Sequence, residues 1–195
     1  LKIIYIIVLM EIQSEINLNK KWNKLYRKKN LIKNIGDIKF DSHWRLYHHY
    51  SNDDKWGIDS YTNIYNIYTI KDYWEFYNNK IQLNNNMFFL MRGDIEPNYE
   101  DPNNCNGGYF SFKYDINDIY KVWLTLSLYL VSENLSLHEN NHITGITIST
   151  KKNLRKKFFI IKVWNSDSSY NDLSYINHKV LDYKSKNIIY NKFFN

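Results

Sequence analysis

The chain is poor in the residues that cross-link, kink or loosen a polypeptide. Its 195 residues include one cysteine, two prolines and six glycines. The single Cys105 excludes an internal disulfide and is typical of a reducing compartment, so we expect a cytoplasmic protein. The scarcity of proline and glycine argues against long linkers. A chain of this length also buries enough surface to fold without a disulfide or a metal.

Long hydrophobic runs are also missing. The apolar run at residues 3–10 is too short to span a bilayer. One lysine precedes it, as in a signal peptide, but no small-residue cleavage site follows. We therefore expect no membrane association. We interpret residues 1–37 as an N-terminal extension, apolar and then basic, that precedes one domain at residues 38–195.

Acidic residues are outnumbered, with 20 Asp and Glu against 26 Lys and Arg, which gives a net charge of +6. A positive field favours polyanionic partners, although solubility and AT-rich codon usage explain the same excess. Aromatic residues make up 17% of the chain, including 18 tyrosines and 6 tryptophans. They favour strands and supply surfaces on which a flat ligand can stack.

The hydrophobic periodicity indicates strands and helices from about Ile38 onward. We expect strands at 44–50, 61–68, 87–91, 109–113, 143–150, 158–165 and 188–190. We expect helices at 70–80, 116–132 and 170–183, capped by Thr69, Asp115 and Ser168 or Ser169. Strands without a regular βαβ alternation predict an α+β fold, with an antiparallel sheet and helices on one face. The other face is then open to a ligand.

The segment at residues 92–101 carries the clearest chemical signal. It predicts the end of a strand, a turn set by Pro97, and then an aromatic ring directly followed by a carboxylate, Tyr99 and Glu100. A second aromatic residue, Trp56, lies upstream in a polar loop. Two rings hold a flat cation from both faces while a carboxylate accepts hydrogen bonds from its edge. Methylated guanine is such a ligand.

The order of these residues resembles that of the cap-binding translation initiation factor 4E family. The resemblance covers about residues 38–165 well and the following segment weakly. Each motif alone is unspecific, but the set stands in the family's order at near its spacing. The matching pieces are Trp44, Trp56, Ile70-Lys71-Asp72-Tyr73-Trp74, Tyr77-Asn78, Ile81-Gln82-Leu83, residues 95–101, Gly107-Gly108, Trp123-Leu124 and Trp164. The resemblance implies a curved antiparallel sheet of seven or eight strands, three helices on its convex face and a ligand slot on its concave face.

The resemblance also implies a slot for the 7-methylguanosine cap of messenger RNA. Trp56 and Tyr99 match the two rings that sandwich the base, and Tyr99 stands where the family usually has tryptophan. Such stacking contributes about 1–3 kcal/mol per ring, so tyrosine predicts a weaker or retuned clamp. Glu100 matches the residue that accepts hydrogen bonds from guanine N1–H and N2–H₂. Trp164 matches an aromatic residue that touches the methyl group.

For the cap triphosphate, the resemblance implies cations on the fifth and sixth strands and their connection. Lys151 stands nearest to the family's arginine position. Lys162 stands two residues before Trp164 and would share its strand face. The cap-phosphate candidates are Lys151, Arg155, Lys156 and Lys162. Tyr109, directly after the glycine pair, replaces a further basic residue and removes one phosphate contact. A solvated hairpin is the alternative interpretation of the basic run at 151–157.

The resemblance implies a partner-binding surface on the opposite face. Its matching positions are Ile38, Ile70, Trp74, Leu124 and Leu128. Ile38 and Lys39 replace the family's usual His-Pro, which indicates a divergent partner. The implied partner is a scaffold subunit of the initiation complex or a repressor peptide, and the chain alone is expected to be a monomer.

We therefore predict a non-enzymatic protein that binds capped messenger RNA and recruits a scaffold for translation initiation. No cofactor is expected, and the scattered histidines predict no metal site. One alternative is a competitor that sequesters capped messages without recruiting a scaffold. Another is a nucleotide-processing enzyme with Glu96 and Glu100 as acid and base.

Overall fold

The computed structural model describes residues 36–50, 53–79, 81–83, 86–114, 119–138, 140–152, 157–177 and 186–194. All but two residues of the predicted extension lie outside these ranges, so its form stays a prediction.

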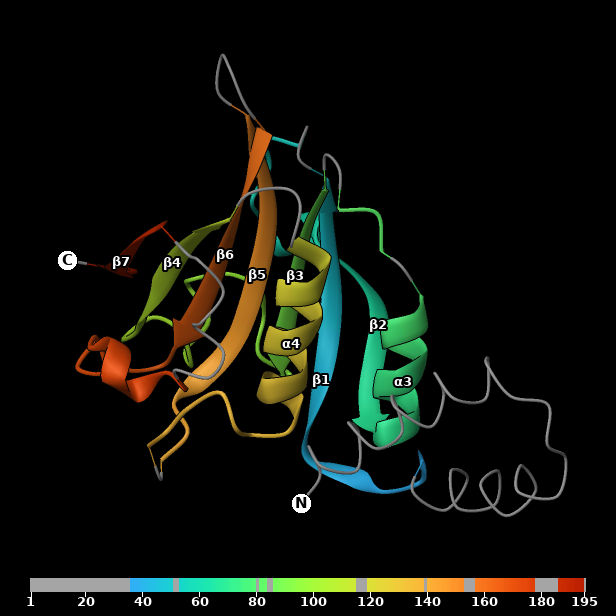
Figure 1. Cartoon of the computed structure of the whole chain (residues 1–195). Coiled ribbons are helices and arrows are strands. Elements are labelled where there is room, and N and C mark those ends of the chain that lie inside the picture. The colour runs from blue at the N-terminus through green and yellow to red at the C-terminus, as the bar shows by residue number, and fades with distance from the viewer. Residues whose placement is uncertain are drawn as a thin grey trace, which may run out of the picture.

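The described residues form one antiparallel sheet of seven strands. The strands are β1 (Lys39–Tyr50), β2 (Thr62–Thr69), β3 (Asn86–Arg92), β4 (Gly108–Tyr114), β5 (Ile143–Lys152), β6 (Lys157–Asn165) and β7 (Lys186–Lys192). Their spatial order is β2-β1-β3-β5-β6-β4-β7, and every neighbouring pair is antiparallel (Figure 1). The prediction of an α+β fold built on an antiparallel sheet is confirmed.

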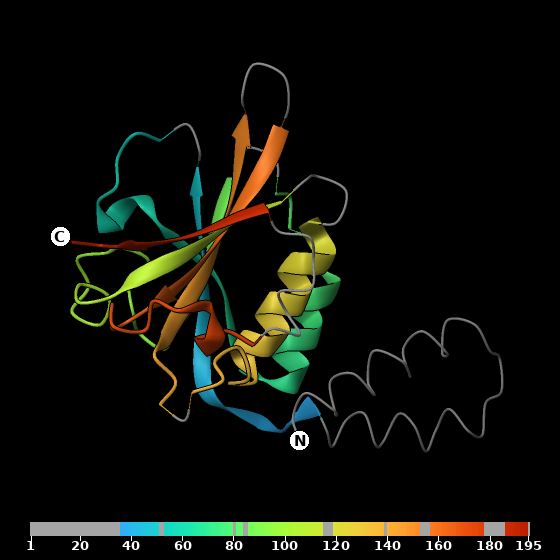
Figure 2. The same ribbon diagram turned by 60° about the vertical axis from the view of Figure 1, so that its left-hand side comes forward.

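Two α-helices, α3 (Ile70–Asn78) and α4 (Ile119–Val131), lie side by side against one face of the sheet (Figure 2). A reciprocal capping box starts α3, as the sequence predicts. The Thr69 hydroxyl accepts a hydrogen bond from the Asp72 N–H at 3.2 Å, and the Asp72 carboxylate accepts one from the Thr69 N–H at 2.8 Å. The buried side of α4 packs into the main core, on which both helices rest.

The helix expected over 170–183 is wrong for its described part, which ends at Asn177. Residues 173–175 form a single 3-10 turn that Asp172 caps, instead of Ser168 or Ser169. The reason is a long-range pairing with the segment after α4. The Leu137 N–H donates to the Tyr175 carbonyl at 2.9 Å, and the Asn177 N–H donates to the Leu135 carbonyl at 2.9 Å. These backbone groups are therefore unavailable for a continuous helix.

The face opposite the helices, here called the concave face, carries a separate cluster of buried side chains. The cluster consists of Tyr47, Phe89, Met91 and Trp164. Strand register extends this face across the sheet, because partners in neighbouring strands point to the same side. One such row runs through Tyr47, Phe89, Thr147, Lys162 and Ser111.

Candidate ligand-binding site

The indole ring of Trp56 stacks flat on the imidazole ring of His49, a residue near the end of β1. Their ring centroids are 4.5 Å apart, with 6° between the planes. His49 is fully buried, and its Nε2 lies 2.9 Å from the carbonyl oxygen of Lys55. A carbonyl only accepts hydrogen bonds, so this nitrogen carries the proton. The Trp56 side chain is 52% exposed. One face of the indole is thus supported by the imidazole, while the indole still presents surface to a ligand.

Tyr99 and Glu100 are exposed on a loop that is held from inside by two buried polar residues. The Asp101 carboxylate accepts a hydrogen bond from the Glu96 N–H at 2.9 Å. The Asn104 amide donates to the Glu96 carbonyl at 3.2 Å. Buried polar groups that satisfy loop backbone in this way rigidify it. The loop therefore presents Tyr99 and Glu100 in a fixed position before any ligand arrives.

The glycine pair after this loop allows β4 to approach its neighbours closely. A Cβ atom on Gly107 would overlap the backbone of Asn165, and one on Gly108 would overlap Tyr190 and Asn191. The Gly108 N–H also donates to Oδ1 of Asn165 at 2.9 Å. Gly107 and Gly108 therefore fix the end of the loop against β6 and β7.

Trp164 lies in the floor of the concave face and is only 5% exposed. Phe89 meets its ring edge-on, with centroids 6.1 Å apart and planes at 80°. Phe193 packs against it at 4.9 Å between centroids. The indole Nε1 has no hydrogen-bond partner among the residues that the structure describes. Trp164 thus supplies a small, mostly covered apolar contact.

Lys162 lies on the same face as Trp164, as the period of the strand predicts. Its Nζ stands 4.0 Å from the centre of the Tyr109 ring, a cation–π contact. Burial, and secondarily the charge of Lys151, lower the pKa of Lys162 to about 8. No carboxylate within the described ranges forms an ion pair with it. The structure thus holds a desolvated cation next to the position where the sequence predicts a lost phosphate contact.

Tyr61 lies between the loop that carries Trp56 and the loop that carries Tyr99. Its ring lies 5.1 Å from that of His49 and 5.3 Å from that of Phe89, measured between centroids. Its pKa is raised to about 12, first by burial and then by the ionisable groups of Tyr99 and Glu100. The loop that carries Tyr99 and the residues under Trp56 therefore border one region of the concave face. Figure 2 shows both loops on the side of the sheet that faces away from the helices.

Two phenylalanines after β7 also belong to this region, and the sequence reasoning missed them. Phe194 meets Tyr99 at 5.5 Å between ring centroids, and Phe193 contacts Tyr109 at 5.6 Å as well as Trp164. The Phe193 N–H donates to the Gly107 carbonyl at 3.1 Å, which ties the segment to the loop. The available signal was an aromatic pair that begins three residues after the last predicted strand, at 188–190.

One of the remaining phosphate candidates lies among the described residues. Lys151 is exposed at the end of β5, opposite Phe158 of β6. Arg155 and Lys156 lie outside the described residues, so their predicted contacts stay predictions.

The predicted partner surface is partly core. Ile70 and Leu128 are only 1% and 7% exposed, whereas Trp74 and Leu124 are partly exposed. Ile38 is half-buried against the core, and its carbonyl accepts a hydrogen bond from the Ile70 N–H at 3.0 Å. Only part of the predicted set therefore offers side-chain surface to a partner.

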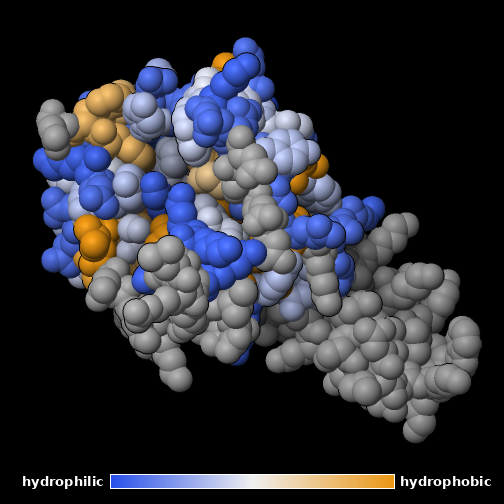
Figure 3. Space-filling view, turned by 90° about the horizontal axis from the view of Figure 1, so that it is seen from above, coloured by the Kyte–Doolittle hydropathy of each residue, from blue (hydrophilic) through white to orange (hydrophobic). Residues whose placement is uncertain are grey.

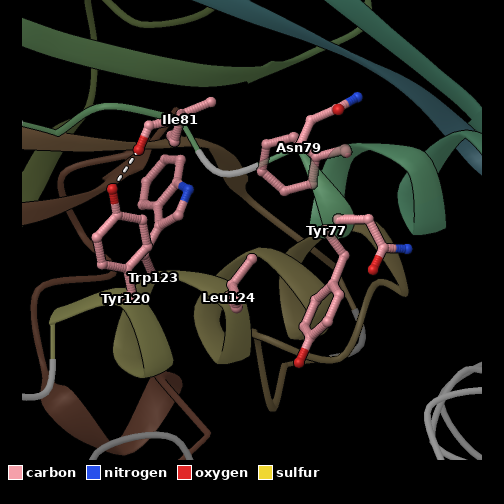
Figure 4. Close-up of a pocket in the computed structure, with 8 residues that line it drawn as sticks. Tyr77, Asn79, Ile81, Tyr120, Trp123 and Leu124 are labelled. Atoms are coloured by element: carbon pink, nitrogen blue, oxygen red, sulfur yellow. Dashed lines mark hydrogen bonds between the residues drawn. The ribbon is translucent and has the colours of Figure 1, made fainter. Parts of the chain in front are cut away.

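A groove of about 420 Å³ lies between the end of α3 and the start of α4. Its lining includes Tyr77, Ile81, Tyr120, Trp123 and Leu124, and the Tyr120 hydroxyl donates to the Ile81 carbonyl (Figure 4). Trp74 borders the groove through Tyr77, on which it stacks at 5.4 Å with 9° between the planes.

The described ranges hold neither a metal cluster nor a membrane-spanning helix. No group of three or more His, Cys, Asp or Glu side chains there could hold a metal ion. No helix there is long and apolar enough to cross a membrane.

The sequence model of the family described as Eukaryotic initiation factor 4E matches residues 39–194. A translation initiation factor 4E homologue from Acanthamoeba polyphaga mimivirus is 42% identical over 72 residues, which cover 36% of this chain and 26% of that protein. Factor 4E-2 of Arabidopsis thaliana is 29% identical over 157 residues, covering 70% of this chain and 64% of that protein. The chain thus spans about a quarter to two thirds of these relatives.

Solved structures share the fold. Ascaris suum eIF4E-3 in complex with an m7G cap superposes with a TM-score of 0.65 at 22% identity, covering 80% of this chain and 92% of that one. Caenorhabditis elegans eIF4E-3 with the 4E-binding protein Mextli gives a TM-score of 0.64 at 19% identity, covering 80% and 93%.

Proposed function

Because the chain belongs to the eukaryotic initiation factor 4E family, we propose that it is a non-enzymatic cytoplasmic factor whose concave face binds the 7-methylguanosine cap of messenger RNA. The observation that carries the proposal is an unbroken series of ring contacts. It runs through Trp56, His49, Tyr61, Phe89, Trp164 and Phe193, and the adjacent Phe194 contacts Tyr99. The three aromatic base-binding residues, Trp56, Tyr99 and Trp164, are thus attached to one aromatic framework, and Glu100 directly follows Tyr99 in the chain.

In this slot, Trp56 and Tyr99 stack on the methylated base, and Glu100 accepts hydrogen bonds from its N1–H and N2–H₂ edge. The exposure of all three side chains supports these roles, because a ligand can reach them. Charge-assisted hydrogen bonds to the cationic base add to the stacking energy. Trp164, in the floor, contacts the methyl group.

Lys162 and Lys151 bind the cap phosphates. Lys162 lacks an acidic partner in the described part of the chain and is held near Lys151, whose charge adds to the lowering of its pKa. Two unneutralised cations on one face attract a polyphosphate. Arg155 and Lys156 complete the set in the proposal.

A fluorescence titration of the whole chain with 7-methyl-GTP and with GTP tests the cap slot. We expect saturable tryptophan quenching by the methylated nucleotide and far weaker binding of GTP. Glu100→Gln should weaken binding of the methylated ligand by about 10- to 100-fold, the range for hydrogen bonds to a charged group. Glu75→Gln, on the helix side, is the matched control. Equal, strongly salt-dependent binding of both nucleotides without an effect of Glu100→Gln would reduce the proposal to general attraction of polyanions.

The proposal includes recruitment of a scaffold helix on the opposite face, where Ile38, Trp74 and Leu124 offer side-chain surface and the buried Ile70 and Leu128 support them from below. The apolar groove beside Trp74 and Leu124 supports this role. Trp74→Ala should abolish binding of a scaffold-derived peptide and leave 7-methyl-GTP affinity unchanged. A protein that binds the cap but no such peptide would instead sequester capped messages.

A further inference from the structure

A second aromatic–cation pair lies on the concave face, near the start of β6. Alternate residues of a strand share a face, so Phe158 points to the same side as Lys162 and Trp164. The intervening Phe159, Ile161 and Val163 belong to the core under the helices. Phe158 is only half-buried, and the Nζ of Lys113 stands 4.2 Å from the centre of its ring.

Register places the Phe158 ring between two exposed lysines. Lys151 of β5 pairs directly with Phe158, and Lys113 of β4 pairs with Ile160, two residues along the same face. Neither lysine forms an ion pair with a carboxylate of the described residues. This region is therefore positive and carries an accessible aromatic ring. Figure 3 views the molecule from the end of the sheet where β5 ends and β6 begins. It shows a mostly hydrophilic surface with scattered apolar patches.

The position of the pair continues the proposed cap slot. A strand advances by about 3.3 Å per residue. Lys162 therefore lies about 7 Å from Trp164 along β6, and Phe158 lies about 20 Å from it. A cap with its methyl group at Trp164 and its phosphates at Lys162 directs the attached RNA toward Phe158.

We propose that Phe158 and Lys113 form a binding site for the first nucleotide after the cap. The base stacks on the phenyl ring, and the Lys113 ammonium binds the phosphate of that nucleotide. The cation–π contact of an exposed lysine is weak, so Lys113 leaves its ring face to the base at little cost. Stacking on an aromatic ring tolerates every base, so the site increases affinity without reading sequence. The inference rests on the proposed cap-binding function.

Affinities of the whole chain for 7-methyl-GTP and for the capped dinucleotide 7mGpppA test the site. Phe158→Ala should weaken dinucleotide binding about 5- to 20-fold, the lower part of the range for base stacking, and change 7-methyl-GTP binding less than about twofold. Phe158→Trp should retain binding of the dinucleotide, whereas Phe158→Leu, which preserves apolar packing, should not. Lys113→Ala should reduce the salt dependence of binding of both ligands by about one phosphate contact, because the 5′ phosphate of the first nucleotide is the third phosphate of the bridge, which 7-methyl-GTP also carries.

Tyr68→Ala and Lys71→Ala, which remove an exposed aromatic ring and an exposed lysine elsewhere, are the matched controls and should bind both ligands normally. Equal affinity of wild-type protein for the two ligands at high salt, where the extra charge of the terminal phosphate of 7-methyl-GTP is screened, would overturn the inference and leave the cap slot intact. Equal losses for both ligands in Phe158→Ala would also overturn it, because the ring would then serve the fold or the triphosphate. Failure of 7-methyl-GTP to bind at all would instead contradict the proposed function itself.

Discussion

The ring of Phe194 meets the ring of Tyr99 edge-on, with centroids 5.5 Å apart and 68° between the planes. Tyr99 occupies the position where the resemblance expects a larger indole. A second ring against its side restricts the orientations that the smaller residue samples. Phe194 is therefore a positioning residue for the proposed clamp.

Phe194→Ala should weaken 7-methyl-GTP binding about two- to tenfold, because aromatic pairs contribute about 0.5–1.5 kcal/mol. Phe194→Tyr keeps an aromatic ring and should retain the wild-type affinity for 7-methyl-GTP. A double-mutant cycle with Tyr99→Ala checks the mechanism: coupling between the two substitutions is expected, and strictly additive losses would show that Phe194 acts independently. Ile189→Ala, an exposed position on β7, is the control.

His49 should hold the Trp56 ring in its ligand-binding orientation through ring stacking. His49→Phe preserves a flat aromatic support and should retain most of the affinity for 7-methyl-GTP. His49→Ala leaves a cavity and removes the support, so it should lower both this affinity and the free energy of unfolding by about 2 kcal/mol or more. Ligand titration and chemical denaturation of the two variants separate the effects. Equal affinity of both variants for the ligand would show that Trp56 orients itself.

Lys162 should make the phosphate part of binding depend on pH. Its pKa of about 8 in the free protein lies below the ordinary 10.5, and a bound phosphate raises it by favouring the charged form. The contribution of the phosphates to affinity is therefore greatest below about pH 8 and declines as pH rises through that value. The total decline in affinity is about tenfold for each unit by which phosphate binding raises the pKa of Lys162. The ratio of affinities for 7-methyl-GTP and 7-methylguanosine isolates this contribution, because both ligands share the base. Lys162→Arg should flatten the profile; a pH-independent ratio in the wild type would exclude Lys162 as the source.

Because burial disfavours the charged Lys162, replacing it with an uncharged side chain should stabilise the folded protein. A lysine with a lowered folded pKa disfavours the fold most below that pKa, and the cost disappears as pH rises from about 8 toward 10.5. Lys162→Met should raise the free energy of unfolding at neutral pH by roughly 1–3 kcal/mol, with a smaller gain near pH 10. Denaturation at both pH values measures this, and a loss of stability at neutral pH would contradict it.

Arg92 joins the end of β3 to the end of α4, and removing its partner should destabilise the whole domain. Its guanidinium donates to both carboxylate oxygens of Glu133 at 2.6 and 2.7 Å and to Ser42 at 2.7 Å. Both side chains of the ion pair are about one-fifth exposed. Glu133→Gln should therefore lower the free energy of unfolding by about 2–4 kcal/mol, since a largely buried charge loses its partner. Lys71→Ala, which removes an exposed ion pair with Glu75, should cost less than about 1 kcal/mol.

Local patterns in the sequence predict most of this fold. The capping box at Thr69 and the shared face of Lys162 and Trp164 follow from neighbours a few residues apart, and both are confirmed. The helix predicted after Tyr170 is wrong in its described part, because its backbone pairs with a segment about 40 residues away. The supports of the proposed slot were missed for the same reason. His49 and Phe194 gain their roles from rings brought together only by the folded sheet.

The order of the strands has a consequence for synthesis of the protein. β7 pairs only with β4 among the described strands, and Phe193 and Phe194 reach the concave face directly after it. The ribosome makes these residues after every other part of the proposed slot. A nascent chain that has folded β1 to β6 therefore still lacks one wall of the proposed slot, which is complete only when this segment emerges.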